Sequence, residues 1–377
     1  MNFWAALAVV TKAALIMTAV ISAVPILVWF ERRGAGWIQN RRGPNRIKIF
    51  GIKNAGLIQP VADAIKFAFK EDIIPDNANK LYYMLAPMVM LVTALMAYAV
   101  IPIAPISSIP GVSVQFPPTI NGVPLPFVVA PIDVGILFIF AMAGLGVYGI
   151  VMAGWASNSN YAMLGGLRAT AQMISYEISM TLSIIGVLML SGTVDLNQIV
   201  VDQAQNHIFG IIPRWNFIPQ ILGFLVFITA VYAEANRTPF DLPEGESEIV
   251  AGYHVEYGSM KFMLFYFAEY IALVTAGMLI TTLYFGGWSF PGLNFAMDGI
   301  ADWMTVKGAS AVLTSFAVSL LPVTVFTVKT VFFMMLFVWV RWTVPRFRYD
   351  QLMQLGWKVL LPLSLINIVI TAVYMLF

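Results

Sequence analysis

The stretch ALIMTAVISAVPILVWFERRGAGWIQNRRGPNR, residues 14–46, joins the end of a long apolar run to a dense basic segment. Residues 4–30 are almost uncharged, and about 20 consecutive apolar residues are enough for a helix to cross a bilayer. The glutamate and five arginines that follow mark the point at which the chain leaves the hydrocarbon. The stretch therefore predicts a transmembrane helix that ends in an aqueous loop.

Seven further apolar runs of similar composition recur along the chain. They lie at residues 81–103, 131–154, 172–190, 216–235, 262–285, 318–340 and 357–376. Only 11% of the 377 residues are charged, whereas soluble domains carry about 25%. The first run is long and lacks a preceding basic segment, so it is expected to stay in the mature protein. We predict an all-α integral membrane protein, a single transmembrane domain over residues 1–377 with about eight transmembrane helices.

The distribution of Lys and Arg predicts how these helices are oriented. The loops after the first, third, fifth and seventh predicted helices hold sixteen Lys and Arg, ten of them in residues 31–80. The loops after the second, fourth and sixth hold only Arg214 and Lys307. Because positive charge accumulates in cytoplasmic loops, the first set is expected in the cytoplasm, with both termini on the outer, periplasmic side.

The long first loop, residues 31–80, contains a segment too short and too charged to span, QPVADAIKFAFKED at 59–72. Its apolar side chains recur at helical spacing, at Val61, Ile65, Ala68 and Phe69. Its charged side chains fall on the opposite side, at Asp63, Lys66 and Lys70. The pattern predicts an amphipathic helix in the membrane interface. Such a helix is either a surface anchor or a doorway for a lipid-soluble ligand, with Asp63 and Lys66 as polar contacts.

A second cytoplasmic loop, residues 236–261, is acidic, and Glu234 lies two residues before its start. Six carboxylates face only two cations, Arg237 and Lys261, and the six are Glu234, Asp241, Glu244, Glu246, Glu248 and Glu256. Asp241 followed by Glu244 also fits a helix N-cap with its capping-box partner, which accounts for part of the cluster. Crowded carboxylates raise one another's pKa and titrate as a coupled set. The loop is therefore a candidate for exchanging protons.

Three charged residues lie within predicted spans and away from the span ends: Glu177, Glu269 and Lys329. An ionised group at mid-bilayer costs about 2.5–3.5 kcal/mol on insertion scales, so such residues normally face a bundle interior or a water path. We predict that Glu177, Glu234 and Glu269 form one hydrated line from the cytoplasmic loop toward mid-membrane. Lys329 is a further candidate for this proton path.

The sequence contains no cysteine, which excludes cysteine-ligated metal and iron–sulfur clusters held by this chain. Its two histidines fall in different loops, so a bis-histidine haem between spans is not expected either. No metal site is predicted. Any electrons that matter to function must belong to partner subunits.

Several stretches, in order along nearly the whole chain, carry a family resemblance. They are ERR (31–33), RRGPNR (41–46), LIQPVADAIKFAFKED (57–72), GWASNSNYAMLGGLRATAQMISYEI (154–178), AEANRTPFDLPEGESEIVAGYHVEYGSMKF (233–262), AEYI (268–271), FGGW (285–288) and RYDQLMQLGWK (348–358). Together they resemble the family of quinone-chamber membrane subunits of bacterial NADH:quinone oxidoreductase, respiratory complex I, whose mitochondrial member is called subunit 1. TPFDLPEGESE within an eight-helix frame is the most specific part.

The resemblance implies a proton-translocating subunit that caps the inner end of a quinone chamber and is not catalytic alone. The residues that match the family's chamber and entrance are Glu31, Arg32, Asp63, Lys66, Arg237, Phe240 and Asp241. The residues that match its acidic track toward antiporter-like subunits are Glu177, Glu234, Glu244, Glu246, Glu248, Glu256 and Glu269.

The family's assembly implies the remaining partners. FMN and iron–sulfur clusters would sit in partner subunits, and quinone would be a substrate and not a covalently bound group. Peripheral-arm subunits would complete the chamber, with small and antiporter-like membrane subunits and lipid as further neighbours and no nucleic acid. The location would be the cell inner (cytoplasmic) membrane.

Two other functions remain open at this stage. A homologous subunit of a membrane-bound hydrogenase or ferredoxin-linked complex shares the scaffold and need not bind quinone. A stand-alone ion transporter would show internal repeats and broken helices, and neither is evident. The segment IKIFGIKNAGLI, between RRGPNR and the amphipathic helix, is longer than the family pattern, which leaves the choice among ubiquinone, menaquinone and plastoquinone open.

Overall fold

The computed structural model describes residues 3–45, 48–49, 52–53, 56–106, 119–120, 123–124, 126–205, 207–208, 212–242, 250–308 and 310–376. Within these ranges, seven helical stretches are long and apolar enough to cross a membrane. They are α1 (Phe3–Ile38), α3 (Lys80–Met96, extended by η1, Ala97–Ala99), α4 (Gly135–Ala156), α5 (Asn160–Ser191), α9 (Ser259–Tyr284), α11 (Ala311–Thr343) and the continuous run of α12 (Tyr349–Gln354), η3 (Leu355–Leu360) and α13 (Leu361–Leu376). The prediction of a multi-pass helical membrane protein is confirmed.

The eighth predicted span, residues 216–235, falls on a shorter apolar helix, α7 (Ile221–Glu234). Its 14 residues cover about 21 Å, less than the roughly 30 Å of the hydrocarbon core. The predicted amphipathic helix is α2 (Gln59–Phe69), which ends three residues before the predicted boundary. Two helices that the apolar runs do not predict, α6 (Leu196–Gln205) and α10 (Leu293–Val306), lie in the loops.

The remaining elements are small. A single 3-10 turn, η2 (Gly252–His254), precedes α9. Each of three antiparallel β-hairpins has two residues per strand: β1 (Lys48–Ile49) with β2 (Ile52–Lys53), β3 (Thr119–Ile120) with β4 (Val123–Pro124), and β5 (His207–Ile208) with β6 (Ile212–Pro213). All three hairpins are in loops between helices, so the core is helical.

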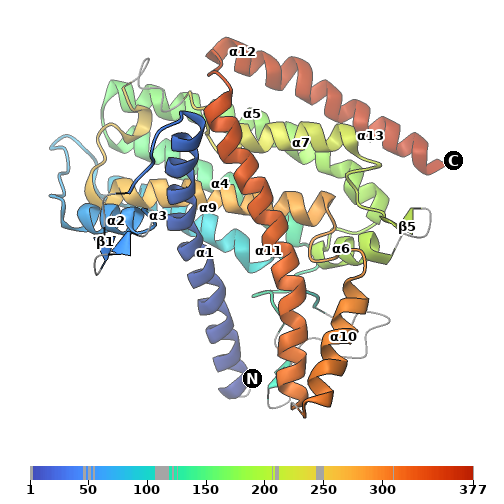
Figure 1. Cartoon of the computed structure of the whole chain (residues 1–377). Helices are drawn as coiled ribbons and strands as arrows, with labels where there is room; N and C mark the ends of the chain where they lie inside the picture. Colours follow the sequence, from blue (N-terminus) through green and yellow to red (C-terminus); the bar gives the residue numbers. More distant parts are fainter. Residues whose placement is uncertain are drawn as a thin grey trace.

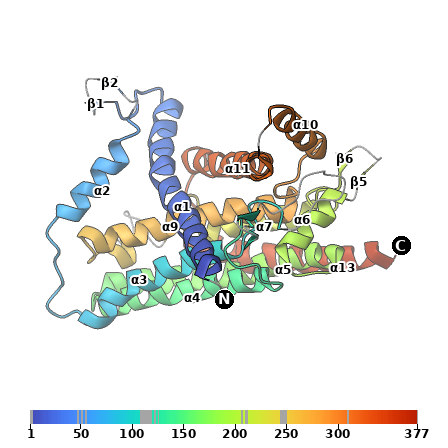
Figure 2. The same ribbon diagram turned by 90° about the horizontal axis from the view of Figure 1, so that it is seen from below.

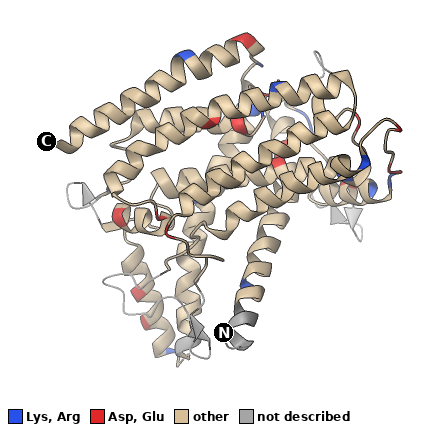
Figure 3. Ribbon diagram, turned by 180° about the vertical axis from the view of Figure 1, so that it is seen from behind, with Lys and Arg blue, Asp and Glu red and all other residues tan. Residues whose placement is uncertain are grey.

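Helix α9 is the centre of the bundle. Most of its residues are buried, and it contacts α3, α1 and α11. Figure 1 shows α1 and α11 crossing α9 steeply. Figure 2 shows α11 on the side of α9 opposite α3, α4 and α5, whereas α1 runs across α9 in this view. Figure 3 shows few charged residues along the helices. Buried charged residues in or beside α9 include Glu31, Arg237 and Glu269.

Candidate functional site

A buried carboxylate, Glu31, is held at the crossing of α1, α9 and α11. Its Oε1 is paired with Arg341 from near the end of α11. Its Oε2 accepts a hydrogen bond of 2.8 Å from the Tyr270 hydroxyl of α9 and lies 3.8 Å from Arg237 Nη1. Glu31 is only 7% exposed, and a buried charge is tolerated only where it is paired and hydrogen-bonded. Three helices and one loop therefore combine to stabilise a single anion.

Arg237 lies in the loop after α7 and is shared between two carboxylates. Its Nη2 is 3.7 Å from Glu269 Oε2, while its Nη1 is at almost the same distance from Glu31. Its guanidinium carbon lies 4.1 Å from the centre of the Tyr270 ring. Burial alone would lower the pKa of Arg237, but Tyr270, Glu31 and Glu269 together raise that pKa well above its usual range. Arg237 is therefore a permanent cation.

Gln172 of α5 positions the loop that carries Arg237. Its buried amide nitrogen lies 2.8 Å from the carbonyl oxygen of Ala233, 2.9 Å from that of Phe240 and 3.2 Å from Asn236 Oδ1. These acceptors flank Arg237 on both sides. The loop is thereby tied to α5, and Arg237 is directed toward α9.

The other two predicted chamber residues of this loop lie apart from the buried carboxylates. Phe240 is 4% exposed and packs between the rings of Tyr176 and Phe347. Asp241 Oδ2 accepts a 2.9 Å ion-pair hydrogen bond from Arg346 Nη2 near the surface. Phe240 thus helps to pack the loop, and Asp241 ties it to the segment after α11.

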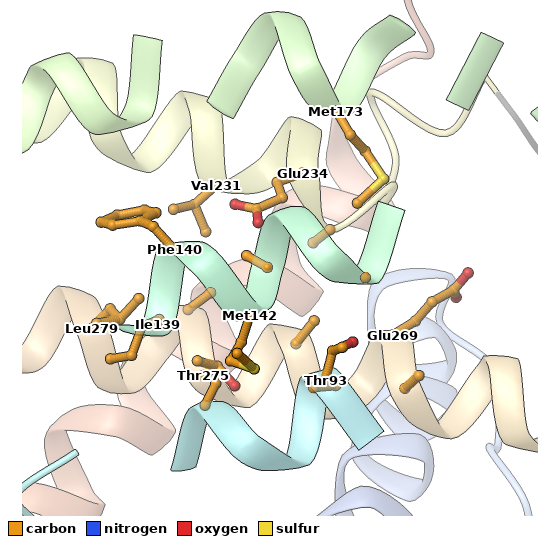
Figure 4. Close-up of a pocket in the computed structure, with 18 of the residues that line it drawn as sticks. Thr93, Ile139, Phe140, Met142, Met173, Val231, Glu234, Glu269, Thr275 and Leu279 are labelled. Carbon is orange, nitrogen blue, oxygen red and sulfur yellow. The ribbon is translucent and has the colours of Figure 1, made fainter. Parts of the chain in front are cut away.

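Glu269 connects this cluster to an internal cavity of about 100 Å³. The Tyr253 hydroxyl donates a 2.9 Å hydrogen bond to Glu269 Oε1. Glu269 and Glu234 both line the cavity, together with Thr93, Thr275 and apolar side chains; Figure 4 shows the two glutamates on opposite sides, from α9 and α7. A water molecule occupies about 30 Å³. The cavity therefore has room for a few waters.

Glu177 lies beside this cavity, on the α4 side. A Cβ atom added to Gly144 of α4 would be 3.2 Å from Glu177 Oε1, and two nearby residues of α4, Ala143 and Gly146, line the cavity. Glu177 thus lies near the cavity that Glu234 and Glu269 line.

The remaining candidates of the acidic track are distributed differently. Glu256 is half-buried in the segment before α9, and its backbone oxygen accepts a 2.6 Å hydrogen bond from Tyr83. Glu244, Glu246 and Glu248 lie outside the described residues, as does the capping box expected for Asp241 and Glu244.

Lys329 of α11 lies at the far end of α9. Its Nζ donates to the carbonyl oxygens of Phe285 at 2.7 Å, Gly287 at 3.1 Å and Ser289 at 2.6 Å. Sixteen residues of helix, about 24 Å, separate Phe285 from Glu269. The structure therefore does not bring Lys329 to the acidic cluster, and its contacts are those of a cation that closes the C-terminal end of α9.

A second, larger pocket of about 470 Å³ opens between α1, α2 and α9. Its lining is apolar apart from an ion pair between Arg32 and Asp63 at its edge; the Gln59 amide also donates a 3.1 Å hydrogen bond to Asp63. Tyr266 lines this pocket, and its ring lies 5.6 Å from the Arg237 guanidinium. Lys66 is exposed on α2 and is not among the lining residues.

The sequence alone did not single out several members of the buried cluster. Arg341 was counted only as a loop charge, and nothing distinguished Tyr253, Tyr266 and Tyr270 from other tyrosines. Gln172 occurs within a long quoted motif, but its role depends on the loop it meets. The one signal that could have been used was the position of Arg341 directly after an apolar run, where a charge is costly.

Comparisons with known proteins identify the family. A profile of the NADH dehydrogenase family matches residues 11–372. The chain belongs to the NADH dehydrogenase family. A subunit of the NADH-quinone oxidoreductase of Koribacter versatilis is 42% identical over 369 residues, which cover 96% of this chain and 95% of that protein.

Two other members of the family are similar to the same degree. The corresponding NADH-quinone oxidoreductase subunit of Bdellovibrio bacteriovorus is 42% identical over 372 residues, covering 96% of this chain and 94% of its own. NADH-quinone oxidoreductase subunit 8 of Rhodothermus marinus is 42% identical over 370 residues, covering 98% and 96%. The family predicted from the quoted motifs is confirmed.

Proposed function

We propose that this chain is the membrane subunit of a proton-translocating NADH:quinone oxidoreductase that receives quinone and passes the effect of its reduction to a chain of buried carboxylates. The observation that carries the proposal is that two cavities meet at Arg237. The larger pocket, between α1, α2 and α9, reaches Arg237 through Tyr266. The smaller cavity, lined by Glu234 and Glu269, reaches Arg237 through Glu269.

The larger pocket suits a lipid-soluble quinone. Its volume of about 470 Å³ lies within the range of ordinary ligand pockets, and its apolar lining fits a ring carried on a hydrocarbon tail. Arg32 at its edge offers a hydrogen-bond donor to a quinone carbonyl oxygen, and Asp63 offers an acceptor to a hydroxyl of the reduced quinol. The amphipathic helix α2 forms one wall, which supports the role of a doorway over that of a mere anchor.

The smaller cavity suits proton movement. Glu234 and Glu269 face a space large enough for a few waters, and Glu177 stands next to it. Each carboxylate can hold a proton on an oxygen and pass it through water to the next. Because Glu269 shares Arg237 with Glu31, a change of charge near the larger pocket alters the free energy of ionising Glu269.

The partners follow from what the chain itself lacks. With no cysteine, it cannot hold iron–sulfur clusters in the usual way. Its family implies that FMN and the clusters sit in peripheral-arm subunits, which would complete the quinone chamber. Small membrane subunits and antiporter-like subunits would receive the proton-coupled signal. We place the chain in the cell inner membrane with eight spans, α7 being the eighth, and with both termini on the outer side.

The test begins with the assembled complex. The chain is tagged, the complex is purified from its native membrane in mild detergent, and NADH-driven quinone reduction is measured together with flavin, iron and nickel. Activity with flavin and iron supports the proposal. A complex with nickel and no quinone reductase activity would indicate the hydrogenase relative, and a chain that purifies alone yet transports ions would indicate a transporter.

A pair of substitutions on α2 tests the doorway itself. Ala64 lines the larger pocket, whereas Ala68, one turn further on, is exposed and outside the lining. Ala64→Trp should fill the pocket and raise the KM for quinone by about tenfold, since one or two lost apolar contacts are worth about 1–3 kcal/mol. Ala68→Trp is the matched control and should leave KM unchanged. Equal KM values in the two variants would remove the pocket from the quinone route.

A further inference from the structure

The buried cluster at the helix crossing contains equal numbers of opposite charges. Glu31 and Glu269 supply two carboxylates, and Arg237 and Arg341 supply two guanidinium groups. The two cations are not equivalent. Arg341 forms a direct ion-pair hydrogen bond with Glu31, whereas the nitrogens of Arg237 stay 3.8 Å and 3.7 Å from the two carboxylates, beyond hydrogen-bond distance.

Arg237 is thus a cation without a close anion of its own. Among the described residues, its Nε and Nη2 atoms are buried and have no hydrogen-bond partner. The guanidinium is retained by stacking on Tyr270 and by the two carboxylates on either side. An unsatisfied buried donor costs about 1–3 kcal/mol, so Arg237 gains by moving toward whichever carboxylate lacks another partner.

We propose that Arg341 is a positioning residue: by neutralising Glu31 from α11, it leaves Arg237 shared with Glu269 and so keeps the larger pocket connected to the acidic cavity. This inference rests on the proposed function above. Arg341 does not line either pocket. It acts through Glu31, whose neighbour in the chain, Arg32, lines the larger pocket.

The charge count predicts what happens without Arg341. In Arg341→Gln, two carboxylates compete for one arginine, and Glu31 has lost the cation that was hydrogen-bonded to it. Arg237 then needs to move only about 1 Å to form a normal hydrogen bond to Glu31, and it leaves Glu269 by moving. A change of charge in the larger pocket then no longer reaches Glu269 through Arg237, although every residue of the larger pocket is still present.

The same count predicts a rescue. In the double variant Glu31→Gln with Arg341→Gln, the cluster again has one carboxylate, Glu269, for one guanidinium, Arg237. The charge balance and the pairing across the two pockets are restored. A role of Arg341 in mere packing would not be rescued in this way, because the second substitution replaces no lost volume.

The experiment uses the assembled complex in native membrane vesicles with four variants: Arg341→Gln, Arg341→Lys, the double variant and Arg348→Gln. Arg348 is the matched control, since it loses the same charge from an exposed ion pair with Asp350. NADH oxidation by ferricyanide, which bypasses quinone, normalises for assembled complex. Quinone reductase kcat and KM and proton uptake per NADH are then compared.

We expect Arg341→Gln to lower kcat and proton uptake at least about fivefold, the lower end of typical coupling between sites, with KM for quinone within about twofold. Arg341→Lys should retain intermediate kcat, and the double variant should exceed Arg341→Gln. If the complex with Arg341→Gln fails to assemble, the inference predicts that the double variant restores assembly.

Three results would overturn the inference while leaving the proposed function intact. The first is that Arg341→Gln matches Arg348→Gln in all readouts, the second that it changes KM and not kcat, and the third that the double variant is no better than Arg341→Gln. Failure of the proposed function is distinct, because then the wild-type complex itself shows no proton uptake linked to NADH-driven quinone reduction.

Discussion

A single added methyl group at Gly165 should disconnect Tyr253 from Glu269. Gly165 of α5 faces the turn at Gly252, and a Cβ atom at Gly165 would lie 2.5 Å from Gly252 Cα and 2.7 Å from Tyr253 N. The shorter distance is about 0.9 Å inside ordinary van der Waals contact. All these atoms belong to backbone, so no flexible side chain can yield. The segment that carries Tyr253 must move away from α5.

The size of the effect follows from two opposing contributions. Alanine stabilises a helix interior by about 0.5–1 kcal/mol over glycine, and overpacking costs about 1–3 kcal/mol, so the net loss of stability of Gly165→Ala is at most about 2.5 kcal/mol. The functional loss is larger. The Tyr253–Glu269 hydrogen bond of 2.9 Å would lengthen past its limit, and a hydrogen bond to a charged group is worth about 1.5–3 kcal/mol.

The assay is turnover and proton uptake per NADH in vesicles, normalised by ferricyanide reduction. Gly165→Ala should lower quinone reductase kcat by at least about tenfold, the lower end of what the lost hydrogen bond is worth, with assembly near the wild-type level. Gly299→Ala is the control, because a Cβ added there in α10 meets nothing within 4 Å. Turnover of Gly165→Ala equal to that of Gly299→Ala would refute the reasoning that α5 positions Glu269 through this turn.

Three further changes test other parts of the site. Glu177→Gln keeps the shape of the side chain but removes its charge, so proton uptake per NADH should fall while assembly is largely preserved; normal uptake would contradict the acidic line. Gln172→Leu strips hydrogen bonds from the loop around Arg237 and should lower the temperature of heat inactivation, each orphaned carbonyl costing about 1–3 kcal/mol, whereas exposed Gln39→Leu should not; equal inactivation temperatures would argue against the anchor. Lys329→Met removes the donor of three hydrogen bonds at the end of α9, so the complex should lose stability but retain its ratio of protons to NADH. A changed ratio with unchanged stability would instead assign Lys329 to proton transfer, and exposed Lys307→Met is its control.

The sequence predicted most of what depends on neighbours along the chain. The apolar runs located the long helices because a helix in lipid must satisfy its own backbone and cover itself with apolar side chains. The helical spacing of the apolar residues in segment 59–72 located α2, because this spacing is also a local property of the sequence. The short α7 and the loop helices α6 and α10 were harder to predict, since tertiary packing and not length or hydropathy alone decides such elements.

The candidate site was predictable as a set of residues but not as an arrangement. Glu31, Arg237 and Glu269 stood out as charges in or beside apolar surroundings. Nothing in their spacing indicated that all three would meet, or that Lys329 would bind the distant end of α9 instead.

What the sequence by itself determined is therefore the class of protein, the positions of its long helices and its family. The tertiary structure decided which charges are partners: Arg341 lies 310 positions from Glu31, and the two pair because the C-terminal ends of α1 and α11 come together beside α9 (Figure 1). The physical reason is that helix formation in lipid is settled within each segment, whereas the pairing of buried charges depends on the crossing of helices that are remote in sequence.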